Sequence, residues 1–212
     1  MNYEEMIELL KTAKKDEEID NYRLEIAEII PQVKIMFDYD QKNHTHQYDL
    51  WHHSLHAVLE LPRGLDDDML YLGALLHDIG NPDCQTAGHR IDDENMHYYG
   101  HPEKGAQIVQ DEVLSTLHEH GIDLLFEDQK RLVYYVKYHD DHVSLRMKHL
   151  RRHLQMTSLE NFKKLMLLQV ADAKAHVRFP FIEERIEICG KLAGVYADEL
   201  YERMIIEDSK RH

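Results

Sequence analysis

The most apolar stretch of the chain covers residues 69–79 and predicts a helix in the middle of the fold. Its apolar side chains occupy most of the helix circumference, a pattern typical of a helix buried on all sides. Gly80 suits the position after a helix and Pro82 follows it, so we expect the helix to end there. His77 and Asp78 then lie in its last turn, where the Asp78 carboxylate needs a partner because burying an unpaired charge is very costly.

Two explanations satisfy this His-Asp pair. A divalent metal ion at the helix end would be bound by both side chains, since imidazole and carboxylate are ordinary ligands of transition metals. A buried hydrogen bond between His77 and Asp78 would satisfy the carboxylate without a metal. The dipeptide alone does not distinguish the two.

Apolar residues at helical spacing continue through most of the chain. They predict helices within residues 3–30, 50–61, 102–117, 128–139, 159–176 and 181–206. The first of these segments fits one or two helices that end or kink at Pro31, and the last is interrupted weakly at Gly190 and Gly194. We find no alternating strand pattern, repeat or linker, so we predict an all-α fold with a single domain over residues 1–212.

Some of these helices carry ionisable residues on or beside an apolar face. His52 and His53 stand at opposite edges of the apolar face of their helix, and the periodicity does not choose between them. His139 lies on an apolar stripe, where a histidine is more often an ordinary core residue than a ligand. Asp172 lies in the middle of a core-facing stripe, where an aspartate without a partner is rare.

Two polar segments, residues 38–49 and 83–100, are rich in turn formers and predict loops. His44 and His46 lie in the first loop, and we expect both to be solvated. The second loop is long, and long loops in compact domains are often functional. His101 follows it and precedes a proline, which favours the first position of a helix, so His101 faces either a pocket at the helix N-terminus or solvent.

Composition narrows the possible partners. The chain has 25 Lys and Arg against 40 Asp and Glu, a net charge of -15, which argues against nonspecific binding to nucleic acid or anionic membranes. A small phosphorylated substrate stays possible where a site is locally positive. The 17 histidines favour a metal site without locating it.

Cysteine usage and the N-terminal sequence bear on the compartment. Cys84 and Cys189 form no CxxC motif, so neither a disulfide framework nor a thiolate zinc site is indicated. The first 20 residues are charged throughout and contain no apolar signal core, and no apolar run is long enough to span a membrane. We therefore expect a cytoplasmic protein without a membrane anchor.

The order of these residues resembles the HD-domain metal-dependent phosphohydrolases, whose pattern is a helical His, a His-Asp dipeptide and a distant Asp. Here the pattern is met by His53 in HHSLHAV, His77 and Asp78 in HDIG, and Asp172 in VADAKAH. His53 matches better than His52 because the family's first histidine precedes Ser or Thr and then Leu. The likeness covers residues 45–177, and the N-terminal and C-terminal helices would pack on this core.

A second run, HYYGHPEKGA, looks like the HD domain attached to some tRNA nucleotidyltransferases, whose transferase part this sequence lacks. The resemblance implies a helical bundle with a metal site between its central helices. His101 and His139 are similar to two extra histidines of branches that bind two metals. The implied ligands, with Asp78 bridging two divalent transition-metal ions (Fe, Mn, Ni, Co or Zn), are His53, His77, Asp78, His101, His139 and Asp172. If only one metal binds, His101 and His139 would contact phosphate instead.

The implied reaction is attack of a metal-activated water on a phosphomonoester or phosphodiester of a small molecule or nucleotide. Asp78, His101, His139 and Lys104 would be the catalytic side chains. Lys104 lies one turn after His101 and is either a phosphate clamp or a solvated lysine.

Other side chains are weaker candidates. Arg90, Asn81 and Arg178 are further candidates for binding the substrate, although Asn81 stands where many relatives have Lys. His176, one turn beyond Asp172, either supports that ligand or lies on the surface. The Gly-Tyr-Pro signature of the cyclic-di-GMP branch is missing, which weighs against a cyclic dinucleotide substrate.

Two other functions fit the same residues. Di-iron oxygenases on this helical scaffold use a similar set of six ligands, and bound iron with oxygen consumption would favour them. A non-catalytic sensing module that contains metal would bind the ion without turning over any phosphate ester. The sequence does not predict the substrate, the native metal or the oligomeric state.

Overall fold

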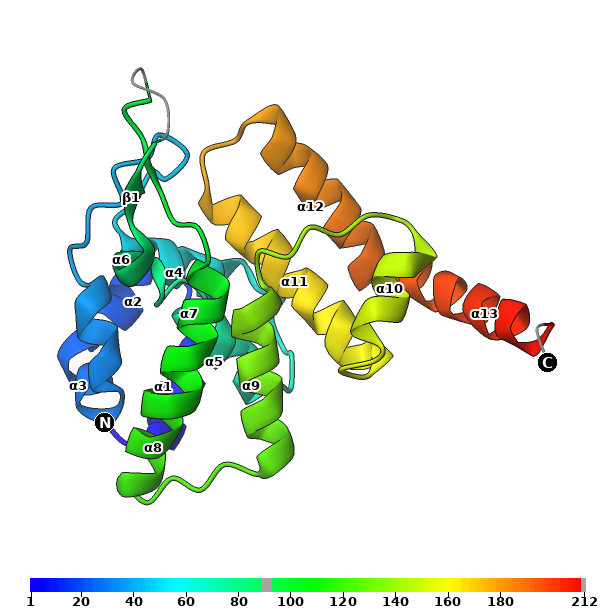
Figure 1. The fold of residues 1–212 in the computed structure, drawn as a ribbon. Helices are drawn as coiled ribbons and strands as arrows, with labels where there is room; N and C mark the ends of the chain where they lie inside the picture. Colours follow the sequence, from blue (N-terminus) through cyan, green and yellow to red (C-terminus); the bar gives the residue numbers. More distant parts are fainter. Residues whose placement is uncertain (89–92, 211–212) are drawn as a thin grey trace.

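The central helix α5 (Asp68–Leu76) is buried on all sides, as its apolar sequence predicts. In the computed structural model, which describes residues 1–88 and 93–210, every α5 residue from Met69 to Leu76 is buried. Asp67 caps its first turn by accepting a hydrogen bond from the backbone N–H of Leu70. The helices that pack most extensively against α5 are α4 (Leu50–Glu60), α9 (Phe126–Tyr138) and α11 (Leu159–Ala175) (Figure 1).

The N-terminal segment forms more and shorter helices than the one or two expected. These are α1 (Tyr3–Thr12), α2 (Asp16–Asp20), α3 (Arg23–Ile29) and the 3-10 helix η1 (Pro31–Met36). Proline begins η1 because it lacks the N–H that would continue α3. Helix α1 packs on α4 and α5, and Trp51 donates a hydrogen bond of 2.9 Å to Asp20, which fixes α2 on α4. The segment is a cover over the core.

The described part of the segment after α5 is not wholly a loop. It contains α6 (Asn81–Cys84) and a two-stranded antiparallel sheet of β1 (Thr86–Ala87) and β2 (Met96–His97). Helix α7 (His101–Ile108) follows, and a π-helical turn η2 (Val109–Val113) joins it to α8 (Leu114–Glu119). Gly100 precedes α7 with a φ of 81°, a left-handed conformation that favours glycine.

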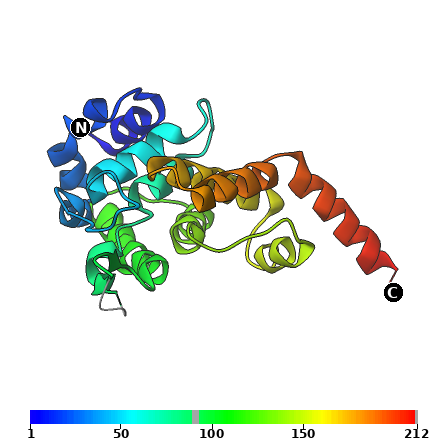
Figure 2. The ribbon, with the colours of Figure 1, turned by 90° about the horizontal axis from the view of Figure 1, so that it is seen from above.

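The C-terminal region is two separate helices, where one long helix interrupted weakly at Gly190 and Gly194 was expected. Helix α12 (Pro180–Ala193) packs along α11, and α13 (Val195–Ser209) packs on α10 (Met147–His153). The break falls at Gly194, whose ψ of -153° is extended, and glycine has low helix propensity. Helix α13 extends away from the end of the molecule that holds the N-terminal helices (Figures 1 and 2).

The structure confirms an all-α fold organised as one domain. Within the described part of the chain, no helix combines the length and the apolar character needed to cross a membrane.

Candidate metal centre

The His77-Asp78 pair emerges directly from the buried end of α5. Both side chains are buried, His77 completely. The turn that follows lies unusually close to α7: a Cβ at Gly80 would stand 2.3 Å from the carbonyl oxygen of His101 and 2.6 Å from the nitrogen of Gly105. The glycine of HDIG therefore allows the start of α7 to approach the His-Asp pair.

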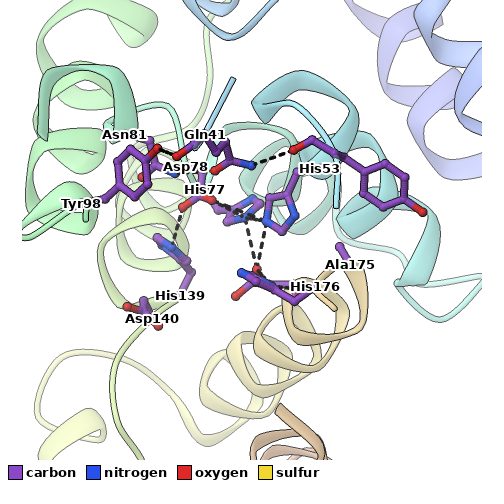
Figure 3. A network of polar contacts seen from close by, with 12 residues as sticks. Gln41, His53, His77, Asp78, Asn81, Tyr98, His139, Asp140, Ala175 and His176 are labelled. Atoms are coloured by element: carbon purple, nitrogen blue, oxygen red, sulfur yellow. Dashed lines mark hydrogen bonds and ion pairs between the residues drawn. The ribbon is translucent and has the colours of Figure 1, made fainter. Parts of the chain in front are cut away.

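The six side chains predicted as ligands lie together between five helices. His53 comes from α4, His101 begins α7, His139 directly follows α9, and Asp172 lies on α11. All but His101 are buried to within a few per cent of full burial. Figure 3 shows His53, His77 and Asp78 facing one another, with His139 contacting Asp78.

The two carboxylate oxygens of Asp78 face two different groups of histidines. Oδ2 lies 3.5 Å from Nε2 of His53 and 3.4 Å from Nε2 of His77. Oδ1 lies 3.2 Å from Nε2 of both His101 and His139. Asp172 completes the first group, with its Oδ1 at 3.2 Å from His53 Nε2 and 3.6 Å from His77 Nε2. Asp78 thus lies between a set of three other ligands and a set of two.

Backbone contacts define which ring nitrogen of three histidines faces the site. Nδ1 of His77, His101 and His139 lies 2.8, 2.7 and 2.7 Å, respectively, from the carbonyl oxygen three residues earlier. Since a carbonyl only accepts, each Nδ1 carries a hydrogen, and a neutral ring then presents a lone pair at Nε2. Such contacts are the usual means of orienting histidines that bind metals.

While the rings are neutral, the lone pairs of His101 and His139 converge without a donor between them. Nε2 of His101 and Nε2 of His139 are 3.1 Å apart, and both face the Asp78 carboxylate. Nε2 of His77 is 3.3 Å from Nε2 of His53, whose Nδ1 is buried without a hydrogen-bond partner. Lone pairs at such distances repel one another unless protons or cations lie between them. The imidazole and carboxylate donors fit a divalent transition-metal ion, so the buried groups can hold metal.

The electrostatics keep both aspartates ionised. Burial opposes ionisation of Asp78 and Asp172, but the neighbouring histidines hold the pKa of each carboxyl well below its usual range. Burial lowers the pKa of His77 and His101, but the Asp78 carboxylate outweighs it and raises both above their usual value. A metal therefore competes with protons at these two rings.

His46 is not solvated as predicted, because it lies over the candidate centre. Its ring centroid is 5.2 Å from that of His53 and 4.5 Å from that of His176, and burial lowers its pKa to about 3. The cause is a long-range backbone pairing: His46 bridges His176, and the N–H of Val177 donates to the carbonyl of Thr45 at 2.9 Å. His44 is exposed, as expected.

The structure also shows where His52 and His176 lie relative to the centre. His52 points away from the centre and contacts the Asp49 carboxylate at 2.9 Å, whereas His53 is fully buried within the centre. Nδ1 of His176 lies 3.3 Å from Oδ1 of Asp172, the place expected for a residue that supports this ligand.

The candidate phosphate-binding side chains lie in less favourable places. Lys104 is partly exposed and pairs with Asp83 at 3.0 Å, and it does not line the cavity beside the centre. Arg178 is half exposed and pairs with Glu183. Arg90 lies outside the described residues. Asn81 is buried and does line the cavity, where its side-chain amide contacts Gln41 at 3.3 Å.

Sequence reasoning missed Arg185, the cation that does reach the centre. Its guanidinium donates to Asp140 Oδ1 at 2.6 Å and to the carbonyl of His139 at 2.7 Å, and it lies 3.6 Å from Oδ2 of Asp172. Burial opposes its charge, but Asp172 and Asp140 raise its pKa, so it stays protonated. The charged pattern of α12 gave no sign that this arginine faces inward.

A cavity of about 190 Å³ opens beside the metal-binding side chains. Its walls combine candidate ligands with residues that could contact a substrate. The latter are Thr45, His46, Asn81, Tyr98, Asp140, His176, Phe181 and Arg185. Tyr98 is held in place by donating its hydroxyl to the carbonyl of Gln41.

Comparison with known proteins agrees with this geometry. The HD domain family model matches residues 43–175, more than half of the chain. No curated protein matches the sequence. The match contains all six candidate ligands, from His53 to Asp172, but ends before Arg185. The chain therefore belongs to the HD-domain family, whose members are mostly metal-dependent phosphohydrolases.

Proposed function

We propose that this protein is a metal-dependent phosphohydrolase that hydrolyses a phosphate ester of a small molecule or nucleotide. The observation that carries the proposal is the convergence of four histidine Nε2 atoms on the two oxygens of Asp78. A hydrogen-bonded core of neutral histidines would place donors opposite acceptors, whereas the neutral rings of His101 and His139 direct Nε2 lone pairs at each other. A pair of cations explains this arrangement.

The two groups of ligands suggest two ions that share Asp78. His53, His77, Asp78 and Asp172 would hold one, and Asp78, His101 and His139 would hold the other. When bound, the ions supply a water acidified toward neutral pH and positive charge for the phosphoryl oxygens.

The side chains around the centre would do the rest. The surface of the protein is strongly acidic, with a net charge of -15, so attraction of a phosphate must be local. Arg185 supplies that local charge and a planar set of N–H donors suited to phosphate. His46 stays neutral because it is buried, so it can contact the substrate without adding charge.

The test combines metal analysis with a search for activity. The protein is purified without added metal, loaded with Mn²⁺, Ni²⁺, Co²⁺, Zn²⁺ or, without oxygen, Fe²⁺, and assayed for phosphate released from mono- and diesters. We expect release that depends on metal and is abolished in His53→Ala, with His52→Ala as the matched control on the neighbouring position. The His52 variant should keep both metal and activity.

The alternatives predict different outcomes in the same experiment. Iron together with oxygen consumption, and no phosphate release, would support a di-iron oxygenase. Bound metal without turnover of any ester and without oxygen consumption would support a sensing module. Either result would overturn the proposal.

A further inference from the structure

A second and larger cavity adjoins the metal centre on the side of α12. Its volume is about 400 Å³, within the range of ~300–1,000 Å³ typical of small-molecule sites. Asp140, Phe181 and Arg185 line both cavities, so the two share a wall. A molecule whose phosphate lies at the metal centre could therefore extend into this second space.

The guanidinium of Arg185 marks the boundary between the cavities. Its Nη1 and Nη2 donate to Asp140 and to the carbonyl of His139, which fix its plane, and the side chain keeps 25% exposure. A guanidinium has five N–H donors, more than these contacts use. Arg185 is thus held rigidly with donors left for an anion beside the metal-binding side chains.

The lining of the second cavity indicates what it would accept. Val143, Phe181 and Ile188 give it an apolar wall, while Asp141 and Glu184 add carboxylates. Asp141 already pairs with Arg152 and His153. Arg185 stands at the boundary with the metal centre, and the other lining residues of this cavity include no lysine or arginine. Further phosphates would therefore meet these carboxylates, so the cavity favours an uncharged or cationic organic group.

We propose, building on the function above, that α12 provides the substrate selectivity of this protein. Arg185 binds the single phosphate of a monoester at the metal centre, and the adjoining cavity takes its partly apolar organic group. Nucleoside triphosphates and other polyphosphates are disfavoured. Arg185 and Ile188 lie beyond residues 43–175, so α12 adds residues from outside the segment that matches the family to a cavity that Val143 also lines.

Non-hydrolysable phosphonates test this site without requiring turnover. Binding of methylphosphonate and phenylphosphonate to the Mn²⁺-loaded protein is measured by calorimetry. Both carry the anion for Arg185, but only the phenyl compound reaches the second cavity. We expect the wild type to bind phenylphosphonate more tightly than methylphosphonate.

Two substitutions separate the two parts of the site. Ile188→Trp fills the second cavity and should weaken phenylphosphonate about tenfold or more by overpacking while leaving methylphosphonate nearly unchanged. Arg185→Gln should weaken both compounds by about tenfold or more, because a charged hydrogen bond is lost. Arg185→Lys, which keeps the charge, should recover part of this loss.

Control variants show whether a loss of binding is caused by misfolding. Ile206→Trp makes the same change at an exposed position of α13 and should leave both affinities unchanged. Val143→Phe fills the same cavity from a residue outside α12 and should repeat the effect of Ile188→Trp. Metal content and thermal unfolding of each variant show whether it folds and loads.

The outcomes separate this inference from the proposed function. Equal weakening of both phosphonates by Ile188→Trp and Val143→Phe, no effect of Arg185→Gln, or no binding to the wild type would overturn the inference. Selective binding as expected, in a protein that hydrolyses no phosphate ester, would uphold the binding site and overturn only the proposed hydrolase.

Discussion

Nε2 of His101 lies 3.1 Å from Nε2 of His139, although the backbone contacts of both rings leave lone pairs on these two atoms. Asp78 Oδ1 stands 3.2 Å from each of them. Three acceptors therefore surround one point, and no side chain among them donates a hydrogen while the rings are neutral. A metal cation at this point, or a proton on one of the rings, would remove the repulsion.

Metal content should distinguish the role of Asp78 from that of His139. We expect about two transition-metal ions per chain in the wild type, about one in His139→Ala and none in Asp78→Ala, because Asp78 faces both groups of ligands. Elemental analysis of protein purified without added metal measures this directly. One ion in the wild type and an unchanged value in His139→Ala would instead move His139 to substrate binding.

Metal affinity should fall on acidification, beginning above pH 6.5. Burial lowers the pKa of His77 and His101, but the Asp78 carboxylate raises both above the ordinary value of 6.5. The metal-free site therefore holds protons, and these protons leave when metal binds. The affinity for metal thus decreases as pH falls, by about tenfold per pH unit for each proton displaced. Titration with Mn²⁺ between pH 8.5 and 6 tests this. A constant affinity over that range would show that neither ring loses a proton when metal binds.

Part of the centre could be predicted because its residues are charged at positions where the neighbouring side chains are apolar. Asp78 at the end of an apolar helix and Asp172 on an apolar stripe each demanded a partner, and the structure brings them into one cluster. The all-α fold followed in the same way, from apolar residues at helical spacing. The local pattern of apolar and polar residues was sufficient to predict these features.

Features that depend on distant segments could not be predicted in this way. His46 belongs to a polar loop, and only its backbone bridge to His176 places it over the centre. Arg185 sits in a helix whose sequence resembles an exposed one, and its contacts with Asp140 and Asp172 require the packing of α12 on α11. The opposite error occurred at Lys104. Helical spacing predicts that it lies on the same side of α7 as His101, but its ammonium pairs with Asp83 instead of facing the metal centre.

Buried carboxylates in this protein are not all candidate ligands, and Asp67 provides the comparison. It is 2% exposed, caps α5, accepts a hydrogen bond of 3.0 Å from the Tyr135 hydroxyl, and lies 3.1 Å from the Lys164 ammonium. Its role is structural, because donors and a cation already satisfy it.

Asp67→Ala should therefore lower stability without affecting metal. Loss of the helix cap and of a buried hydrogen-bond partner should together cost about 2–4 kcal/mol in the free energy of unfolding. Urea unfolding of the metal-free protein measures this, with exposed Asp66→Ala as the neighbouring control. A variant that loses its metal while keeping wild-type stability would show that Asp67 acts on the centre after all.

Gly80→Ala should lower both the free energy of unfolding and the metal content. The added Cβ would meet backbone atoms of His101 and Gly105, which cannot rotate aside as a side chain would, so α7 has to move away from the turn. We expect a cost of about 1–3 kcal/mol in unfolding free energy. Because His101 begins α7, its Nε2 should also withdraw from Asp78, and the chain should lose the ion held by His101 and His139.

Gly190→Ala is the matched control, since a Cβ at this position of α12 meets nothing within 4 Å. Alanine has the higher helix propensity, so this variant should be more stable by about 0.5–1 kcal/mol and keep its full metal content. Urea unfolding without metal and elemental analysis after loading give both quantities for each variant. Wild-type stability and full metal content in Gly80→Ala would show that the close approach of α7 to the turn does not hold His101 at the centre.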